Sequence, residues 1–135
     1  MINRIVIDTN VIISALLFAG TPNKVLQEVI SENCSLYLSH DILNELLHVL
    51  SRKKFRLSED QIKQFYEEVI HISKIVYPSK KLNIVKEDPS DNILFECAVE
   101  IEANYIISGN KHVVNVKRYG DIEVVTPREF IDLFG

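Results

Sequence analysis

The chain opens on a short, mostly apolar and β-branched run, Ile2–Ile7, which is followed at once by the polar residues Asp8, Thr9 and Asn10. A strand with one wet face would alternate apolar and polar residues, whereas this run is typical of a strand buried on both faces in a parallel sheet. Parallel neighbours have to be joined by crossovers, which are usually helices. The run therefore requires the rest of the chain to supply alternating helices and strands.

The remaining sequence meets this requirement, because helical patterns alternate with further short apolar runs. The strand-like runs are Cys34–Leu38, Ser73–Tyr77, Tyr105–Ile107 and Ile122–Val125. The helical patterns are Asn10–Phe18, Pro22–Ser31, Asp41–Leu50, Glu59–His71, Pro89–Glu102 and Pro127–Leu133, and the starts at Ser58, Asp88 and Thr126 carry capping signals. We predict an α/β fold, a three-layer α/β/α sandwich around a central, mostly parallel sheet of about five strands.

Length and composition indicate one globular domain, residues 1–135, with 47% hydrophobic and 25% charged residues. The net charge of −4 excludes a protein that coats nucleic acid by bulk positive charge, so any such contact has to be local. No apolar stretch approaches the roughly 18 residues of a membrane span. We expect a cytoplasmic protein that does not contact a membrane and whose two cysteines, Cys34 and Cys97, are buried thiols.

The first candidate for chemistry is Asp8, because it directly follows the first predicted strand. Functional groups in open α/β sheets gather at the carboxyl ends of the strands. The alternative is that Asp8, Thr9 or Asn10 merely caps the helix that follows, since these residue types are favoured N-caps. Asp8 taken alone leaves both interpretations open.

Two further carboxylates border apolar helix faces. Glu45 falls at the margin of the apolar face of its helix, although a glutamate that only snorkels at the rim is the alternative. Asp91 lies in the first turn of the helix predicted over Pro89–Glu102, in line with apolar positions of that helix, and an inward-facing charge needs a partner. Asp88 is interpreted as the cap of that helix, where the helix dipole favours an acid.

Carboxylates that converge at strand ends repel one another, and a divalent cation relieves that repulsion. Mg²⁺ and Mn²⁺ both take oxygen ligands of this kind. A bound ion can activate water and stabilise a leaving oxygen, so phosphodiester hydrolysis needs no Ser or Cys nucleophile. Together, Asp8, Glu45 and Asp91 predict metal-assisted hydrolysis of phosphodiesters.

Four segments carry a recognisable order and spacing: Ile5-Val6-Ile7-Asp8-Thr9-Asn10, Glu45, Asp88-Pro89-Ser90-Asp91-Asn92 and Ala103–His112. In this order they resemble the PIN-domain family over nearly the whole chain, in particular the VapC-like toxins of prokaryotic type II toxin–antitoxin systems. The resemblance implies a Mg²⁺- or Mn²⁺-dependent endoribonuclease that cleaves single-stranded RNA. It implies that Asp8, Glu45 and Asp91 coordinate the metal, with Thr9, Asn10 and Ser108 as polar neighbours. It also implies a homodimer and an inhibiting antitoxin protein.

The chain departs from the family in one place. Relatives usually carry Thr/Ser-Gly-Asp-Lys-Asp after the fourth strand, whereas this chain has Asn110 and His112 in place of the two acids. Asn110 offers a neutral carbonyl oxygen and His112 a neutral imidazole as further ligands, the latter suited to Mn²⁺. For His112 itself, the alternative is a surface histidine on a short helix. For the whole chain, the alternative is a weakened or inactive PIN-like module that only binds RNA or protein.

The densest basic segment follows the Glu45 helix and comprises Arg52, Lys53, Lys54 and Arg56. Such a rim around an acidic centre would contact RNA phosphates without base specificity, while its alternative role is to complement a helix C-terminus. A phosphotransfer domain is a poor match, because Asn10 stands where an aspartyl phosphatase needs a second Asp. The remaining contest is between a nuclease and a binding module.

Overall fold

A six-stranded sheet organises the computed structural model, which describes residues 2–133. The strands are β1 (Asn3–Ile7), β2 (Cys34–Ser39), β3 (Ser73–Val76), β4 (Tyr105–Ile107), β5 (Arg118–Tyr119) and β6 (Ile122–Val125). The helices are α1 (Thr9–Leu17), α2 (Thr21–Ile30), α3 (His40–Leu50), α4 (Glu59–Ile72), α5 (Asn92–Glu100), α6 (Lys111–Val114) and α7 (Pro127–Asp132), with 3-10 turns η1 (Lys53–Phe55) and η2 (Pro89–Asp91). Residues 1, 134 and 135 of the predicted domain lie outside the described part.

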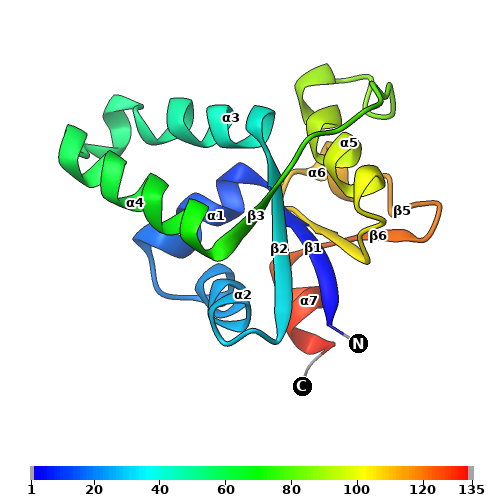
Figure 1. Cartoon of the computed structure of the whole chain (residues 1–135), viewed down its shortest axis with the longest axis horizontal. Helices are drawn as coiled ribbons and strands as arrows, with labels where there is room; N and C mark the ends of the chain where they lie inside the picture. The colour runs from blue at the N-terminus through cyan, green and yellow to red at the C-terminus, as the bar shows by residue number, and fades with distance from the viewer. Residues whose placement is uncertain (1, 134–135) are drawn as a thin grey trace.

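The strand order is β3-β2-β1-β4-β6-β5, and every pairing is parallel except that of β5 with β6. This arrangement confirms the predicted α/β class and the mostly parallel sheet. The strand that the sequence analysis missed is β5, because two exposed residues at a sheet edge leave no hydrophobic pattern. This order makes β1 and β4 parallel neighbours in the middle of the sheet (Figure 1). Their carboxyl ends therefore lie side by side, at the centre of the edge formed by the strand ends.

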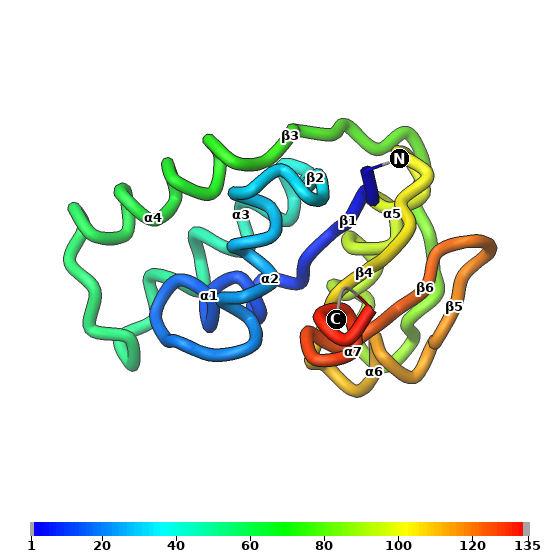
Figure 2. Tube along the Cα trace, turned by 90° about the horizontal axis from the view of Figure 1, so that it is seen from below, coloured from blue at the N-terminus to red at the C-terminus, as the bar shows by residue number. Residues whose placement is uncertain are grey.

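The sheet is covered on both faces. Figure 2 shows α1, α2 and α4 on one side of the sheet and α5 on the other. Fully buried side chains come from the strands and from both helical layers, including Ile5, Leu36, Phe95 and Phe130. Burial of β1 on both faces explains why its sequence is apolar without alternation.

The apolar side chains of the strands and helices pack together in this core. No helix among the residues that the structure describes is long and apolar enough to cross a membrane. Cys34 and Cys97 are buried and unpaired, as predicted. Burial raises the pKa of the Cys34 thiol to about 11 and that of Cys97 to about 12, so both remain protonated and unreactive at neutral pH.

Two helix starts follow the predicted capping chemistry. Ser58 and Gln61 form a reciprocal capping box at α4, and Thr126 and Glu129 form another at α7. The helix predicted over 89–102 is shorter, because η2 precedes α5. The Asp88 carboxylate accepts hydrogen bonds from the Ser90 amide and hydroxyl, which tightens the first turn.

The segment between β3 and η2, residues 77–88, has no regular secondary structure and is called the strap below. Figure 1 shows it running from the end of β3 across to α5. Polar side chains spaced four residues apart on α5 bind its backbone in place of a neighbouring strand. Asn92 accepts from the Ile84 and Val85 amides and donates to the Val85 carbonyl, Glu96 accepts from the Leu82 amide, and Glu100 accepts from the Ser79 amide and hydroxyl.

Replacing Asn92 tests how strongly the strap depends on α5. Asn92→Ala leaves two amides and one carbonyl of the strap without partners, and each such group costs about 1–3 kcal/mol when buried. Because the Val85 amide and carbonyl are the two buried groups among them, we expect the free energy of unfolding to fall by about 2–6 kcal/mol in urea denaturation. Asn83→Ala, at an exposed position of the same strap, is the matched control and should change little. Equal stability of the two variants would contradict the role given to Asn92.

Candidate active site

Asp8 is a buried carboxylate at the carboxyl end of β1. Its main chain starts α1, since its carbonyl accepts hydrogen bonds from the Val11 and Ile12 amides, but its side chain makes no capping hydrogen bond. The carboxylate instead accepts a 2.6 Å hydrogen bond from the hydroxyl of Ser108, which follows β4. Asp8 therefore caps α1 through its backbone only, and its side chain is turned to the neighbouring strand end.

A short turn after β4 connects Asp8 to Asp91. The Ser108 hydroxyl oxygen accepts from the Asn110 amide at 3.0 Å, and the Asn110 side-chain Nδ2 donates to Asp91 Oδ2 at 3.2 Å. Asn110 Oδ1 accepts from the His112 amide at 2.9 Å and so starts α6. An amide nitrogen cannot accept that bond, so the pairing with His112 fixes which end of the Asn110 amide faces Asp91.

Glu45 reaches the same neighbourhood from α3. Its side chain is half-buried, and Oε2 accepts from the buried hydroxyl of Thr9 at 3.3 Å. Asn44 and His48 on the same helix are exposed, so Glu45 lies at the margin of the apolar face, as predicted. Leu47, although apolar, is 38% exposed and does not belong to that face.

Asp91 is buried at the point where η2 passes into α5. Asp88 precedes it by three residues, and residues three apart eclipse each other in a 3-10 turn. Asp88 is exposed on this turn and raises the pKa of both Asp91 and Glu45, so its charge faces the site. From the sequence, Asp88 is predicted only as a helix cap. The signal for its effect on the pKa of Asp91 is the spacing of three residues between the two acids in a tight turn.

The carboxylates of the site hold their protons more firmly than usual. Burial raises the pKa of Asp8, against the opposing effect of the Ser108 hydrogen bond and the adjacent Thr9 and Asn10 amides. Burial and the Asp8 charge raise the pKa of Glu45. Burial, followed by the charges of Asp8, Asp88 and Glu45, raises the pKa of Asp91 to about 6, while His112 acts in the opposite direction. The three predicted carboxylates therefore lie close enough to repel one another.

The chemistry of this donor set fits a hard divalent cation. Asp8, Glu45 and Asp91 present carboxylate oxygens, and mutual repulsion is the condition that a bound cation relieves. Within residues 2–133, no three His, Cys, Asp or Glu side chains are placed tightly enough to hold one ion as they stand. A cation would therefore have to draw the carboxylates together on binding.

The other predicted residues surround these carboxylates at different ranges. Thr9 and Ser108 bind Glu45 and Asp8 directly, whereas the Asn10 side chain is exposed and only its main chain acts on Asp8. His112 is half-buried and acts on Asp91 by its charge and not through a hydrogen bond. The position of Asn110 as a donor to Asp91 could not be predicted from its residue type.

The basic segment after α3 is exposed at each of its four predicted cations, Arg52, Lys53, Lys54 and Arg56. Arg52 lies near enough to Glu45 for its charge to lower the pKa of that carboxyl. The Lys54 ammonium lies 5.1 Å from the centre of the Phe55 ring instead. Among these four cations, Arg52 thus acts on a carboxylate of the site, because its charge favours the ionised form of Glu45.

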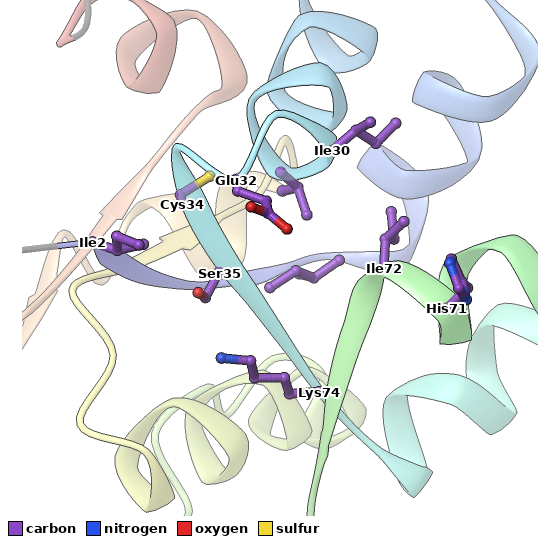
Figure 3. A pocket seen from close by; sticks show the side chains of 10 residues that line it. Ile2, Ile30, Glu32, Cys34, Ser35, His71, Ile72 and Lys74 are labelled. Atoms are coloured by element: carbon purple, nitrogen blue, oxygen red, sulfur yellow. The ribbon is translucent and has the colours of Figure 1, made fainter.

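Hollows elsewhere on the molecule are separate from this site. Figure 3 shows one of about 470 Å³ where β2 and β3 begin, with Cys34, Ser35 and Lys74 among its lining residues. Because parallel strands begin at the edge opposite to the one where they end, this hollow lies away from Asp8. A second, largely apolar hollow of about 500 Å³ lies between α4 and the helices α1 and α2.

Comparison with known proteins agrees with the geometry of this sheet edge. The PIN domain family model matches residues 4–112, a range that includes each predicted metal ligand and the turn after β4. An uncharacterized protein of Methanocaldococcus jannaschii, MJ1680, is 34% identical over 143 residues, which cover 97% of this chain and 91% of that protein. The chain belongs to the PIN-domain family.

Solved structures share the fold at low sequence identity. VapBC2 from Rickettsia felis, solved with a DNA fragment from its promoter, has a TM-score of 0.65 at 15% identity, covering 91% of this chain and 98% of that one. VapBC-1 from nontypeable Haemophilus influenzae has a TM-score of 0.64 at 18% identity, with 93% and 98% covered. PAE2754 from Pyrobaculum aerophilum has a TM-score of 0.66 at 10% identity, with 98% and 94% covered. Family membership supports a nuclease in the general sense.

The raised pKa of Asp91 predicts how stability depends on pH. Between 3.8, its ordinary value, and about 6, the folded chain holds a proton that the unfolded chain has released. Raising the pH through this window therefore lowers the free energy of unfolding. In EDTA, the stability of Asp91→Asn relative to the unaltered chain should rise between pH 4 and 6 and level off above.

Urea denaturation across this pH range measures the effect. Asp121→Asn removes an exposed acid from the β5–β6 turn and should follow the unaltered chain at each pH. If Asp91→Asn has a flat offset from the unaltered chain, or becomes relatively less stable as the pH rises, burial and the neighbouring charges do not raise the pKa of Asp91.

Proposed function

We propose that this chain is a metal-dependent endoribonuclease that hydrolyses phosphodiester bonds of single-stranded RNA. The observation that carries the proposal is the meeting of Asp8, Glu45 and Asp91 at one sheet edge, with Asp8 and Asp91 joined through Ser108 and Asn110. Hydroxyl groups of Ser108 and Thr9 hold two of the carboxylates in place. Membership of the PIN-domain family supports the same class of reaction.

Mg²⁺ or Mn²⁺ is the proposed cofactor, with Asp8, Glu45 and Asp91 as its ligands. When bound, the cation would supply the positive charge and the activation of water that phosphodiester hydrolysis needs. The chain itself contributes a fixed Asp8, an Asp91 that is ionised above a pH of about 6, and an exposed Arg52 beside Glu45. Arg52, Lys53, Lys54 and Arg56 would bind the RNA phosphates without reading bases.

We further propose that the chain acts in the cytoplasm as a homodimeric toxin held inactive by an antitoxin protein. The names of two structural neighbours are those of VapBC pairs, which supports such a partner. The apolar hollow between α4 and α1–α2, bordered by Ile30 and Ile72 and by the acids Glu67 and Glu68, fits an apolar segment flanked by basic residues. This charge pattern favours a basic antitoxin tail as the occupant.

The second candidate function is a PIN-like module that binds RNA or protein with weak or no turnover. The specific observation in its favour is Asn110, whose amide nitrogen faces Asp91 and whose oxygen already accepts from the His112 amide. A neutral donor at this place adds no negative charge for a second cation. The geometry does not change the roles proposed for Asp8, Glu45 and Asp91.

Cleavage of a mixed single-stranded RNA pool distinguishes the two functions. The purified chain should cut RNA with Mg²⁺ or Mn²⁺ and not with EDTA. Asp8→Asn, prepared identically, should lose at least about 100-fold in rate, because charge stabilisation by a bound ion is worth several kcal/mol. Asp121→Asn is the matched control for a contaminating nuclease and for the substitution itself. A folded chain that cuts RNA under none of these conditions is a binding module.

A further inference from the structure

An exposed pair of aromatic rings lies beside the candidate site without a role in the fold described so far. The centres of the His40 and Tyr77 rings are 5.3 Å apart, with the planes tilted by 51°. Tyr77 is 71% exposed and His40 is also exposed. Neither ring takes part in a hydrogen bond with the residues that the structure describes, so the pair presents both apolar ring surface and free polar edges to solvent.

Strand register places this pair at the same sheet edge as Asp8. The paired register of β1 and β2 ends at Ile5 opposite Leu36, and both strands continue toward the same edge of the sheet, β1 to Ile7 and β2 to Ser39. In β2 and β3, Ser39 lies opposite Val76. His40 and Tyr77 directly follow these two positions. Neighbouring strands are about 4.8 Å apart and β2 lies between β1 and β3, so the backbone of Tyr77 is at least two strand spacings, or about 10 Å, from that of Asp8.

Charges around the rings suit a nucleic acid strand. Lys81, four residues beyond Tyr77, is 3.9 Å from both Asp41 and Glu96, and its side chain is 87% exposed. Glu96 is buried, whereas the pair of Lys81 with the exposed Asp41 is long and solvated and contributes little to stability. The exposed ammonium group of Lys81 can therefore also contact a phosphate. The Asp41 charge next to His40 opposes phosphate there, which leaves a base, rather than a phosphate, as the group that fits on the rings.

We propose that His40 and Tyr77 form a base-stacking platform for the RNA substrate, holding a nucleobase close to the phosphate that is cleaved. The inference rests on the proposed function and adds to it a subsite for an unpaired base. Aromatic side chains bind single-stranded nucleic acid because every base has a π-face, so the platform selects unpaired over duplex RNA without selecting a sequence. It supplies the preference for single strands that the carboxylates cannot provide.

Binding of short RNA to the Asp8→Asn chain in EDTA tests the platform apart from cleavage. The probe is a fluorescein-labelled oligouridine, with fluorescence anisotropy as the readout. When Tyr77→Ala is combined with Asp8→Asn, binding should weaken by between about 5-fold and 150-fold, which is the range for loss of one stacked base. His40→Ala in the same background should also weaken binding. Tyr77→Phe keeps the ring and should bind as before. Tyr119→Ala, at the far sheet edge, is the matched control.

A second arm separates stacking from a change of structure. Each oligouridine in a second series lacks one base, and the position of the missing base differs from probe to probe. When Tyr77 is present, only the probe that lacks the stacked base should bind more weakly than the intact oligouridine. At that position, Tyr77→Ala should cause no further loss, because the two changes remove the same contact. Additive losses at every position, or unchanged binding by Tyr77→Ala and His40→Ala, would overturn the platform.

The result also distinguishes the platform from the function on which it rests. If the unaltered chain cuts RNA with Mg²⁺ or Mn²⁺ while Tyr77→Ala and His40→Ala leave oligouridine binding unchanged, the proposed function stands and the platform is overturned. If the chain neither binds oligouridine nor cuts RNA, the proposed function fails and the platform fails with it. Circular dichroism of each variant confirms folding, which the exposure of Tyr77 favours.

Discussion

Repulsion among carboxylates at one edge of a parallel sheet is the constraint on which this molecule's functional architecture depends. Asp8 is fixed there because β1 is buried on both faces and ends at the centre of the sheet. Glu45 reaches it from α3 and Asp91 from η2, and the charge of Asp8 raises the pKa of both, in addition to the effect of burial. Such an arrangement costs stability unless a bound cation compensates the charges, and this cost supports the proposed cation site.

Hydrogen bonds rather than packing set the orientation of these charges. Ser108 holds Asp8, Thr9 holds Glu45, and Asn110 holds Asp91. Asn110 also starts α6 and donates its main-chain amide to Ser108, so one turn of the chain connects two carboxylates that are 83 positions apart in the sequence. Next to Asp91 in the sequence, the Asn92 side chain of α5 accepts hydrogen bonds from the strap at the Ile84 and Val85 amides. These bonds fix the path by which the strap enters η2.

Much of this arrangement could be predicted from the sequence, because its signals are local. The apolar character of β1, the capping boxes and the position of Glu45 at a helix margin each depend on nearby residues. The strand β5 could not be predicted, since two exposed edge residues carry no periodic signal. The donor role of Asn110 and the pairing of His40 with Tyr77 depend on partners that only the tertiary fold brings near. The roles of the predicted ligands in metal binding remain predictions.

The most direct test of the central claim is the free energy of unfolding of the chain at pH 7.5 as a function of Mn²⁺ concentration. If the carboxylates form one cation site, stability should rise with the logarithm of concentration, by about 2.7 kcal/mol at a hundred times the dissociation constant. The rise should be absent from Asp8→Asn and retained by Asp121→Asn. Stability that does not respond to millimolar Mn²⁺, or that rises equally in Asp8→Asn, would contradict a metal centre at Asp8, Glu45 and Asp91.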